Sequence, residues 1–328
     1  MESGVGITGA ACHLPAQRRS VAELCREENA DIAMAARLGI DEVPISNGET
    51  GSETALAASR EALRRAQLDP ALLDVIVDYS ILPQEYLVPA WNMSNKLQHQ
   101  LGAKRAFTVG FSGGAATNFL VALHSAAAML AANDNLKTAL LLAADVTIPG
   151  NRVLNPADPV TVMGDSAGAI VLQRGATFSM VLDSGFSSEA ANHDVCYIPG
   201  GALANPDDTA LYRMVVDKTR YDRAPKWETL QSLATKTLQR AGVKNEEIVF
   251  ALYPNLSESD QQEFRKHFGL RGDQIACNIR RNHGHLQGTD FVINYLSMLD
   301  GGKVSSGQYF LAASHGMGFL SGVTLLRM

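Results

Sequence analysis

A turn of small residues at positions 110–116 is the segment of this chain best suited to nucleophilic chemistry. An apolar run at 106–109 precedes it and predicts a strand, and a long apolar stretch at 115–132 follows it and predicts a helix. Ser112 lies in this turn, where backbone N–H groups and the helix dipole favour a developing negative charge. A nucleophile that attacks a thioester needs that environment. Because glycines before a helix are also commonly structural, the turn needs support from other segments.

Five further short segments follow one another along the chain. They read Arg-Leu-Gly-Ile at 37–40, Gly-Asp-Ser-Ala-Gly-Ala at 164–169, Pro-Gly-Gly at 199–201, Asn-His-Gly-His at 282–285 and Gly-Met-Gly-Phe at 316–319. In this order they resemble the β-ketoacyl-acyl-carrier-protein synthase III family of the thiolase fold, whose members read Arg-Thr-Gly-Ile, Gly-Asp-Gly-Ala-Gly-Ala, Pro-Gly-Gly, His-Gly-Asn and Gly-Gly-Gly-Phe there. The resemblance covers residues 6–327, essentially the whole chain.

The resemblance implies a five-layered αβαβα sandwich made from two similar halves, and a homodimer. It also implies that an acyl group passes from coenzyme A or an acyl carrier protein to a cysteine at the start of the central helix. A histidine and an asparagine of the second half then serve condensation with a malonyl carrier protein. Acyl-CoA or a phosphopantetheinyl carrier would be a substrate, and no permanently bound cofactor is implied.

This sequence departs from the family at all three of those positions. The family's cysteine falls on Phe111, Ser112 or Gly113, and no cysteine lies nearby. Pro254 or Asn255 stands where the family has histidine, and His285 stands where it has asparagine. We therefore expect simple acyl transfer to survive better than decarboxylative condensation, with Ser112 as the acyl acceptor.

A serine hydroxyl is a weak nucleophile unless a base lies within hydrogen-bond distance. His285 is the first candidate base because its segment resembles one that lines the family's active site. Asn255 could orient it, and Asp290 is a further candidate for that role. His193, on a loop just before the Pro-Gly-Gly segment, is a second candidate base, although each histidine could instead be structural.

Backbone and basic residues complete the predicted site. The amide of residue 112 and the loop at Gly316 and Met317 would hold the thioester oxygen, by resemblance to the family. Arg37 matches the arginine that lies near the family's coenzyme A channel, and could otherwise form a surface salt bridge. A basic cluster could receive an acidic carrier protein or could simply be a solvated face; it comprises Arg213, Lys218, Arg220, Arg223 and Lys226.

These segments predict three alternative functions. The first is an acyltransferase that moves an acyl group through Ser112 to a carrier protein or a small acceptor, in polyketide, other natural-product or fatty-acid biosynthesis. The second is a non-catalytic partner subunit of an active homologue, with Phe111 filling the pocket. The third is a condensing enzyme that selects a starter unit.

The elements around these segments predict an α/β protein. Apolar strand-like runs at 75–77, 139–144, 167–172, 248–252 and 309–313 alternate with helical patterns. A helix–turn–strand unit at 61–78 resembles a second one at 236–252, which favours duplicated halves at 1–175 and 176–328. No linker rich in Pro, Gly or Ser separates them, so we expect them to pack as one unit.

Composition excludes several classes of protein. The chain has 328 residues, 46% of them hydrophobic, and a formal net charge of −6, which excludes disordered and collagenous proteins and disfavours nucleic-acid binding. Its four cysteines have no metal-ligand spacing and are expected to be reduced and inert. No signal peptide is recognised at the start, and the stretch at 115–132 contains polar residues typical of a buried helix rather than a membrane span. We therefore expect a cytoplasmic protein without a metal or a membrane partner.

Overall fold

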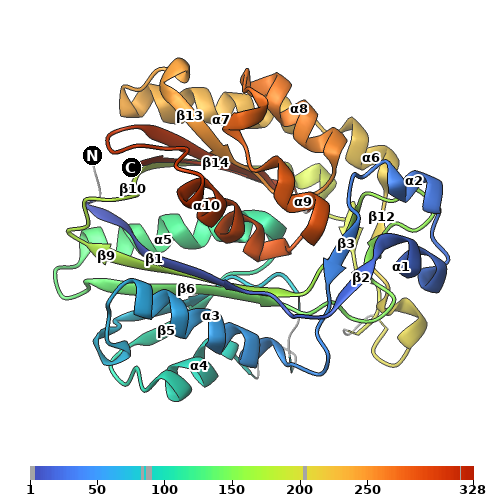
Figure 1. The fold of residues 1–328 in the computed structure, drawn as a ribbon, viewed down its shortest axis with the longest axis horizontal. Helices are drawn as coiled ribbons and strands as arrows, with labels where there is room; N and C mark the ends of the chain where they lie inside the picture. The colour runs from blue at the N-terminus through green and yellow to red at the C-terminus, as the bar shows by residue number, and fades with distance from the viewer. Residues whose placement is uncertain (1–3, 83–84, 86–90, 202–204, 318) are drawn as a thin grey trace.

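The computed structural model describes residues 4–82, 85, 91–201, 205–317 and 319–328, and the side chains of 277 and 278 are not described. Its helices and strands stack in five layers, helix–sheet–helix–sheet–helix (Figure 1). Nine strands form one hydrogen-bonded sheet in the order β13-β14-β15-β10-β1-β9-β6-β4-β5. One residue pair, Gly6 with Met180, joins its two parts, which lie on opposite sides of the central helices.

The two parts of the sheet share one strand arrangement. The first comprises β1 (Val5–His13), β9 (Ser166–Arg174), β6 (Thr138–Asp145), β4 (Val75–Asp78) and β5 (Phe107–Gly110). The second comprises β10 (Met180–Ser188), β15 (Leu320–Arg327), β14 (Tyr309–His315) and β13 (Ile248–Leu252). In both parts two antiparallel pairings are followed by a parallel one, and β5 extends only the first part. This repeated order is the topology that duplicated halves would have.

Two long helices cover the outer face of each part. Helices α3 (Gly51–Arg65) and α4 (Met93–Leu101) pack on the first, and α7 (Lys226–Ala241) and α8 (Glu258–Phe268) pack on the second. Helix α3 begins at a capping box in which Thr50 and Glu53 satisfy each other's backbone N–H groups. Its buried face is built from small side chains, which lets the helix lie close to the strands.

The middle layer contains α5 (Asn118–Ala132) and α10 (Asp290–Asp300). Helix α5 contacts β6 and β9 on one side and β10 and β15 on the other. Together with the preceding 3-10 turn it is apolar and long enough to cross a membrane by composition, but 56% of that window is buried. Its apolar character therefore reflects contact with both parts of the sheet, as the sequence predicted for a core helix.

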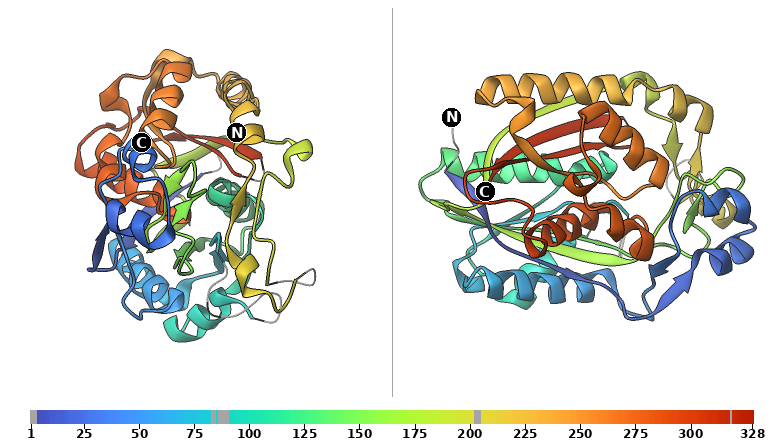
Figure 2. Two further views of the ribbon diagram at one scale, coloured as in Figure 1. Left: turned by 90° about the vertical axis from the view of Figure 1, so that its right-hand side faces the viewer. Right: turned by 45° about the horizontal axis from the view of Figure 1, so that its top comes forward.

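Short elements gather at one end of the layers, beyond the carboxyl ends of β4, β6, β13 and β14 (Figure 2). They are β2 (Arg18–Ser20), α1 (Val21–Glu28), α2 (Ile32–Ala36), β3 (Glu42–Pro44), β7 (Val153–Leu154), β8 (Thr161–Val162), β11 (Cys196–Tyr197), β12 (Val215–Val216), α6 (Lys218–Arg223) and α9 (Cys277–His283). Carboxyl ends of parallel strands are where α/β folds usually bind ligands, and a cavity of about 260 Å³ lies there.

Candidate active site

A cavity of about 260 Å³ opens where the strand ends and the short elements meet. The segments that line it include the turn before α5, the residues after β13, the residues after α9 and the loop after β14. Its wall is mostly apolar, and the polar side chains that line it include His193, His285, Gln287, His315 and Tyr221. An apolar cavity with a few polar groups is the usual form of a small-molecule site.

The turn before α5 presents Ala115 to the cavity. Ala115 opens the 3-10 turn η2 (Ala115–Thr117) with a φ of 47°, a left-handed conformation that is uncommon outside glycine. The loop after β14 presses against it, because a Cβ added to Gly316 would lie 2.1 Å from the Gly114 carbonyl oxygen. Strained positions of this kind are concentrated at functional sites.

Ser112 and Phe111 do not line this cavity. Ser112 is exposed, and Phe111 is partly buried against the middle-layer core. Gly113, Ala115 and Ala116 are the residues of the turn that reach the cavity wall. The structure therefore does not bring Ser112 together with the candidate base His285, and Phe111 does not fill the cavity.

A substituted cysteine tests which residue of this turn faces the cavity. We expect Ala115→Cys to gain an acyl adduct from acetyl-CoA, because a thiol at this helix start has a lowered pKa and faces the cavity of His285. Ser112→Cys is the matched control and should gain no adduct beyond that of the wild type. Intact-protein mass spectrometry measures both, and the reverse pattern would show that residue 112 is the one that faces the substrate.

His285 and Asp290 form a buried pair at one side of the cavity. The His285 Nδ1 lies 2.6 Å from Asp290 Oδ2, so the ring's Nε2 is the nitrogen left for a substrate. Asp290 is fully buried and also accepts hydrogen bonds from the Leu286 N–H at 2.8 Å and the Asn255 N–H at 2.7 Å. A carboxylate held in this way fixes the tautomer and the orientation of the imidazole.

Asn255 lies behind this pair rather than in the cavity. Its Nδ2 donates to Asp290 Oδ1 at 3.1 Å and to Asn294 Oδ1 at 3.1 Å, and its Oδ1 accepts from Gln261 at 3.1 Å. Of the two residues expected at the family's histidine position, Pro254 is the one that lines the cavity. Asn255 thus orients Asp290, which in turn orients His285.

The glycine before His285 lets its strand segment lie against the neighbouring loop. His285 donates its N–H to Val162 O at 3.0 Å and accepts at its own carbonyl from the Gly164 N–H at 3.1 Å. Gly284 has a φ of 63°, and a Cβ there would lie 2.5 Å from Val162 O. The Asn-His-Gly-His segment therefore works through backbone shape as well as through its second imidazole.

Three residues of the 193–197 segment line the cavity: His193, Cys196 and Tyr197. His193 is exposed and lines the cavity, but no described residue hydrogen-bonds its ring. Cys196 is the one cysteine among the described side chains that lines the cavity, and burial raises its pKa to about 12. Its thiol is therefore protonated at neutral pH. Sequence analysis grouped Cys196 with the inert cysteines, because nothing in its spacing signals a site.

The two predicted oxyanion residues of the loop after β14 differ in the hydrogen bonds of their backbone N–H groups. The Gly316 N–H donates to Leu320 O at 2.8 Å, whereas within the described residues the Met317 N–H donates to no protein group. Both residues line the cavity. Of the two predicted oxyanion donors, Met317 is therefore the one whose N–H is available, and Gly318 lies outside the described residues.

His315 is a second imidazole in the cavity wall, and no spacing in the sequence singles it out. It is 3% exposed, with Nδ1 3.1 Å from the Tyr253 hydroxyl and Nε2 3.4 Å from the Tyr221 hydroxyl. Burial and the nearby Lys226 ammonium hold the pKa of His315 well below its usual range, so the ring is neutral. Gln287, also missed, lines the cavity with a left-handed φ of 56°.

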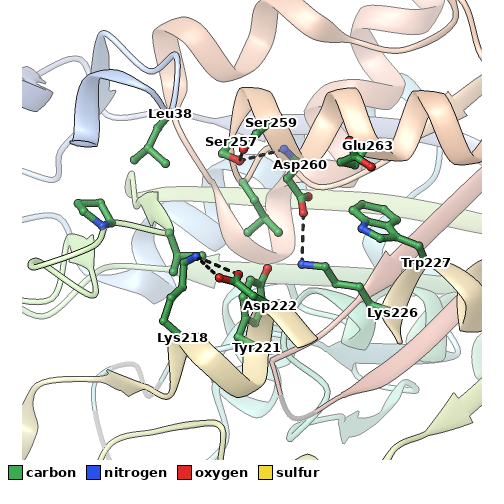
Figure 3. Close-up of a pocket in the computed structure, with 13 residues that line it drawn as sticks. Leu38, Lys218, Tyr221, Asp222, Lys226, Trp227, Ser257, Ser259, Asp260 and Glu263 are labelled. Atoms are coloured by element: carbon green, nitrogen blue, oxygen red, sulfur yellow. Dashed lines mark hydrogen bonds and ion pairs between the residues drawn. The ribbon is translucent and has the colours of Figure 1, made fainter. Parts of the chain in front are cut away.

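A second, smaller cavity of about 180 Å³ adjoins the first, since Tyr221 and Leu256 line both (Figure 3). Lys226 and Asp260 face each other across it with Nζ and Oδ1 3.8 Å apart, and the Lys226 Nζ lies 4.0 Å from the centre of the Tyr221 ring. Burial lowers the pKa of Lys226 and raises that of Asp260.

The predicted basic residues are distributed differently. Arg37 caps α2 and is exposed, as is Arg213, and neither lines a cavity described above. Much of the basic cluster is paired within the protein: Lys218 with Asp222, Arg220 with Asp194, and Lys226 with Asp260. Among the residues that the structure describes, no group of three or more His, Cys, Asp or Glu side chains could hold a metal ion.

The fold is a thiolase-like α/β fold. It matches the crystal structure of 3-oxoacyl-[acyl-carrier-protein] synthase III from Aquifex aeolicus VF5 with a TM-score of 0.83, covering 99% of this chain and 100% of that one. It also matches ChlB3, described as an acyltransferase, with a TM-score of 0.84 at 21% identity over 99% and 97% of the two chains. The priming β-ketosynthase of the R1128 polyketide pathway matches with a TM-score of 0.84 at 21% identity over 98% and 96%.

Within that class, the chain belongs to the synthase III family. The model for 3-oxoacyl-[acyl-carrier-protein] synthase III matches residues 112–190, and the model for its C-terminal part matches residues 238–328, together just over half of the chain. The β-ketoacyl-[acyl-carrier-protein] synthase III of Aquifex aeolicus is 24% identical over 99% of both chains. The predicted family and thiolase-like fold are confirmed; the residue roles stay predictions.

Proposed function

We propose that this protein is an acyltransferase that moves an acyl group from an acyl thioester directly to a bound nucleophile. The observation that carries the proposal is the buried His285–Asp290 pair, 2.6 Å apart, at a cavity whose strained helix-start residue is Ala115. His285 is a base with a fixed tautomer in that cavity, and Ala115, the residue best placed to face it, has no nucleophilic group. The acceptor's own hydroxyl, thiol or amine would therefore attack the thioester.

For a hydroxyl acceptor, the transfer balances as an ester-forming exchange. His285 Nε2 takes the acceptor's proton while the acceptor oxygen forms a bond to the thioester carbonyl carbon. The carbonyl oxygen becomes negative and is stabilised by the Met317 N–H at the loop after β14. The carbon–sulfur bond then breaks, and the leaving thiolate takes the proton back from His285, which gives an ester and a free thiol.

The smaller cavity supports a route for the donor. It opens between α6, α8 and the loop at Leu38, and Tyr221 and Leu256 line both it and the cavity of His285. We propose that the pantetheine arm of acyl-CoA, or of an acyl carrier protein, passes through it. Arg37 and Arg213 are exposed, and each is the sequence neighbour of a cavity-lining residue, Leu38 and Met214 respectively. Their side chains would bind the phosphate groups of coenzyme A or the acidic surface of a carrier protein.

A covalent route through Ser112 is the alternative mechanism. It requires the exposed Ser112 to move into the cavity, and Cys196 would be a second possible acceptor because it already lines the wall. Ser112→Ala and Cys196→Ala, each incubated with a panel of acyl-CoAs and an alcohol acceptor, separate the routes by intact mass and by release of coenzyme A. Direct transfer predicts that both variants release coenzyme A at the wild-type rate. A loss in Ser112→Ala would establish the serine acyl-enzyme.

Carbon–carbon condensation is a second candidate function. The similarity to a priming β-ketosynthase supports it at the level of fold. Pro254 in the cavity wall, with Asn255 turned away toward Asp290, leaves one fewer polar group for a malonyl thioester. Formation of a β-ketoacyl product from acetyl-CoA and malonyl carrier protein would favour this function over direct transfer.

A homodimer in the cytoplasm completes the proposal. Strand β5 is the last strand of the sheet, and its Phe107 side chain is 46% exposed, which is typical of an edge that pairs with another copy. Light scattering measures the mass of the purified protein, and a monomer would contradict this part. A stable mixed dimer with an active homologue would instead favour the partner-subunit hypothesis, which the unfilled cavity disfavours.

A further inference from the structure

His315 and Tyr221 form one polar edge of the cavity of His285, and the contact between the two side chains is long. Both side chains line it, and both are at least 96% buried. Their contact, between His315 Nε2 and the Tyr221 hydroxyl, is 3.4 Å, which is longer than a well-formed hydrogen bond between an oxygen and a nitrogen. Within the described residues the Tyr221 hydroxyl has no other hydrogen-bond partner.

The opposite side of the His315 ring is held in place. Its Nδ1 lies 3.1 Å from the Tyr253 hydroxyl, and burial together with the nearby Asp260 raises the pKa of that hydroxyl. Trp227 packs edge-on against the imidazole, with ring centres 5.7 Å apart. These contacts fix the ring, so Nε2 keeps its direction toward Tyr221 and the cavity.

The chemistry of this edge matches a neutral hydroxyl. A neutral imidazole offers one donor and one acceptor nitrogen, and a tyrosine hydroxyl can both donate and accept. A ligand hydroxyl can therefore bond to both groups at once, whatever the tautomer. A ligand ammonium at this edge would be repelled by the nearby positive charge of Lys226, whose Nζ lies 4.0 Å from the Tyr221 ring centre.

The two imidazoles come from different elements and are organised by one segment. Tyr253 backs His315, and Asn255 holds the Asp290 that backs His285, while Pro254 between them lines the cavity. The segment after β13 thus positions a base on one side and a neutral polar edge on the other. An acceptor in this cavity can meet both.

We propose that the acceptor is a small molecule with two hydroxyl groups, one attacking the thioester beside His285 and the other bound by His315 and Tyr221. This inference rests on the proposed function and names its substrate class. The second hydroxyl takes no part in the transfer, so the edge determines specificity and orientation rather than the chemical step.

Matched pairs of acceptors test the proposal with the full-length protein and acetyl-CoA. The pairs are ethylene glycol with ethanol, 1,3-propanediol with 1-propanol, and 1,4-butanediol with 1-butanol; ester formation is followed by mass spectrometry. At least one diol should exceed its matched alcohol in kcat/KM by about 10-fold after correction for its two equivalent hydroxyls, the effect of one to two hydrogen bonds.

Variants of the edge identify its source. His315→Phe should abolish the diol preference and leave the monohydric alcohol within about 2-fold, and Tyr221→Phe, which removes only one oxygen, should reduce the preference by about 3-fold or more. Equal losses for diol and alcohol would show that the edge is merely structural and overturn the inference. If the wild type transfers to alcohols without any diol preference, the inference of a dihydroxy acceptor is overturned and the proposed function stands. If the wild type transfers to no acceptor, the proposed function itself is overturned.

Discussion

Replacing His285 by asparagine should lower the release of coenzyme A from acyl-CoA by about 10²- to 10⁴-fold, the usual contribution of a positioned general base. The imidazole is the only base in the cavity whose second nitrogen is fixed by a buried carboxylate among the described residues. Asparagine keeps a polar group near Asp290 but cannot take a proton. A thiol-trapping assay with acyl-CoA and either water or an alcohol as acceptor measures the effect.

The matched control is the same substitution at His99, which is exposed on α4 and lines neither cavity described above. His99→Asn should retain the wild-type rate. Thermal unfolding of both variants separates loss of chemistry from loss of fold. If His285→Asn released coenzyme A as fast as His99→Asn, the role assigned to the His285–Asp290 pair would be wrong.

Replacing Asp165 by alanine should lower the free energy of unfolding by about 3–5 kcal/mol, because it leaves a buried arginine without its partner. Asp165 is fully buried and binds Arg152 through two hydrogen bonds of 2.8 and 2.9 Å. It also accepts from the Ser46 and Thr147 N–H groups, each at 2.8 Å. Urea unfolding measures the loss.

An exposed ion pair provides the comparison. Arg281 and Asp41 lie 2.7 Å apart, but their side chains are 69% and 57% exposed. Asp41→Ala should therefore change the free energy of unfolding by less than about 1 kcal/mol. If Asp165→Ala does not fold, Asp165→Asn, which keeps the shape but loses the charge, should still show an intermediate loss. Equal, small effects of Asp41→Ala and Asp165→Ala would contradict the structural role assigned to Asp165.

The family and the fold could be predicted because they depend on backbone requirements that leave marks in the sequence. Gly284 and Gly316 lie where a side chain would meet a neighbouring carbonyl oxygen, so the fold needs glycine at these positions and the segments can be recognised in the sequence. The pattern of apolar strands and helices is likewise set by burial on both faces. Asp165 holds its glycine-rich turn through Arg152, a partner that the sequence does not indicate.

The site was predicted less completely, because a side chain's direction depends on contacts between distant segments. Ser112 and Ala115 are three residues apart in one turn, and only the left-handed conformation of Ala115 and the contact with Gly316 reveal which of them faces the cavity. His315 has no distinguishing pattern, since Tyr221 and Tyr253 reach it from other elements. The sequence predicts Asn255 or Asp290 as the residue that orients His285, and Asp290 is the one that contacts the imidazole.

Time-resolved analysis with enzyme in excess over radiolabelled acetyl-CoA, in the presence of an alcohol acceptor, tests the central claim, direct transfer in the cavity of His285, most directly. Each sample is quenched in acid, and the coenzyme A released is compared with the label bound to protein. Direct transfer predicts that coenzyme A is released, at a rate that depends on His285, while the protein carries no label at any time. Direct transfer would be contradicted if the amount of label on the protein equalled the amount of coenzyme A released and the label were located on Ser112 or Cys196.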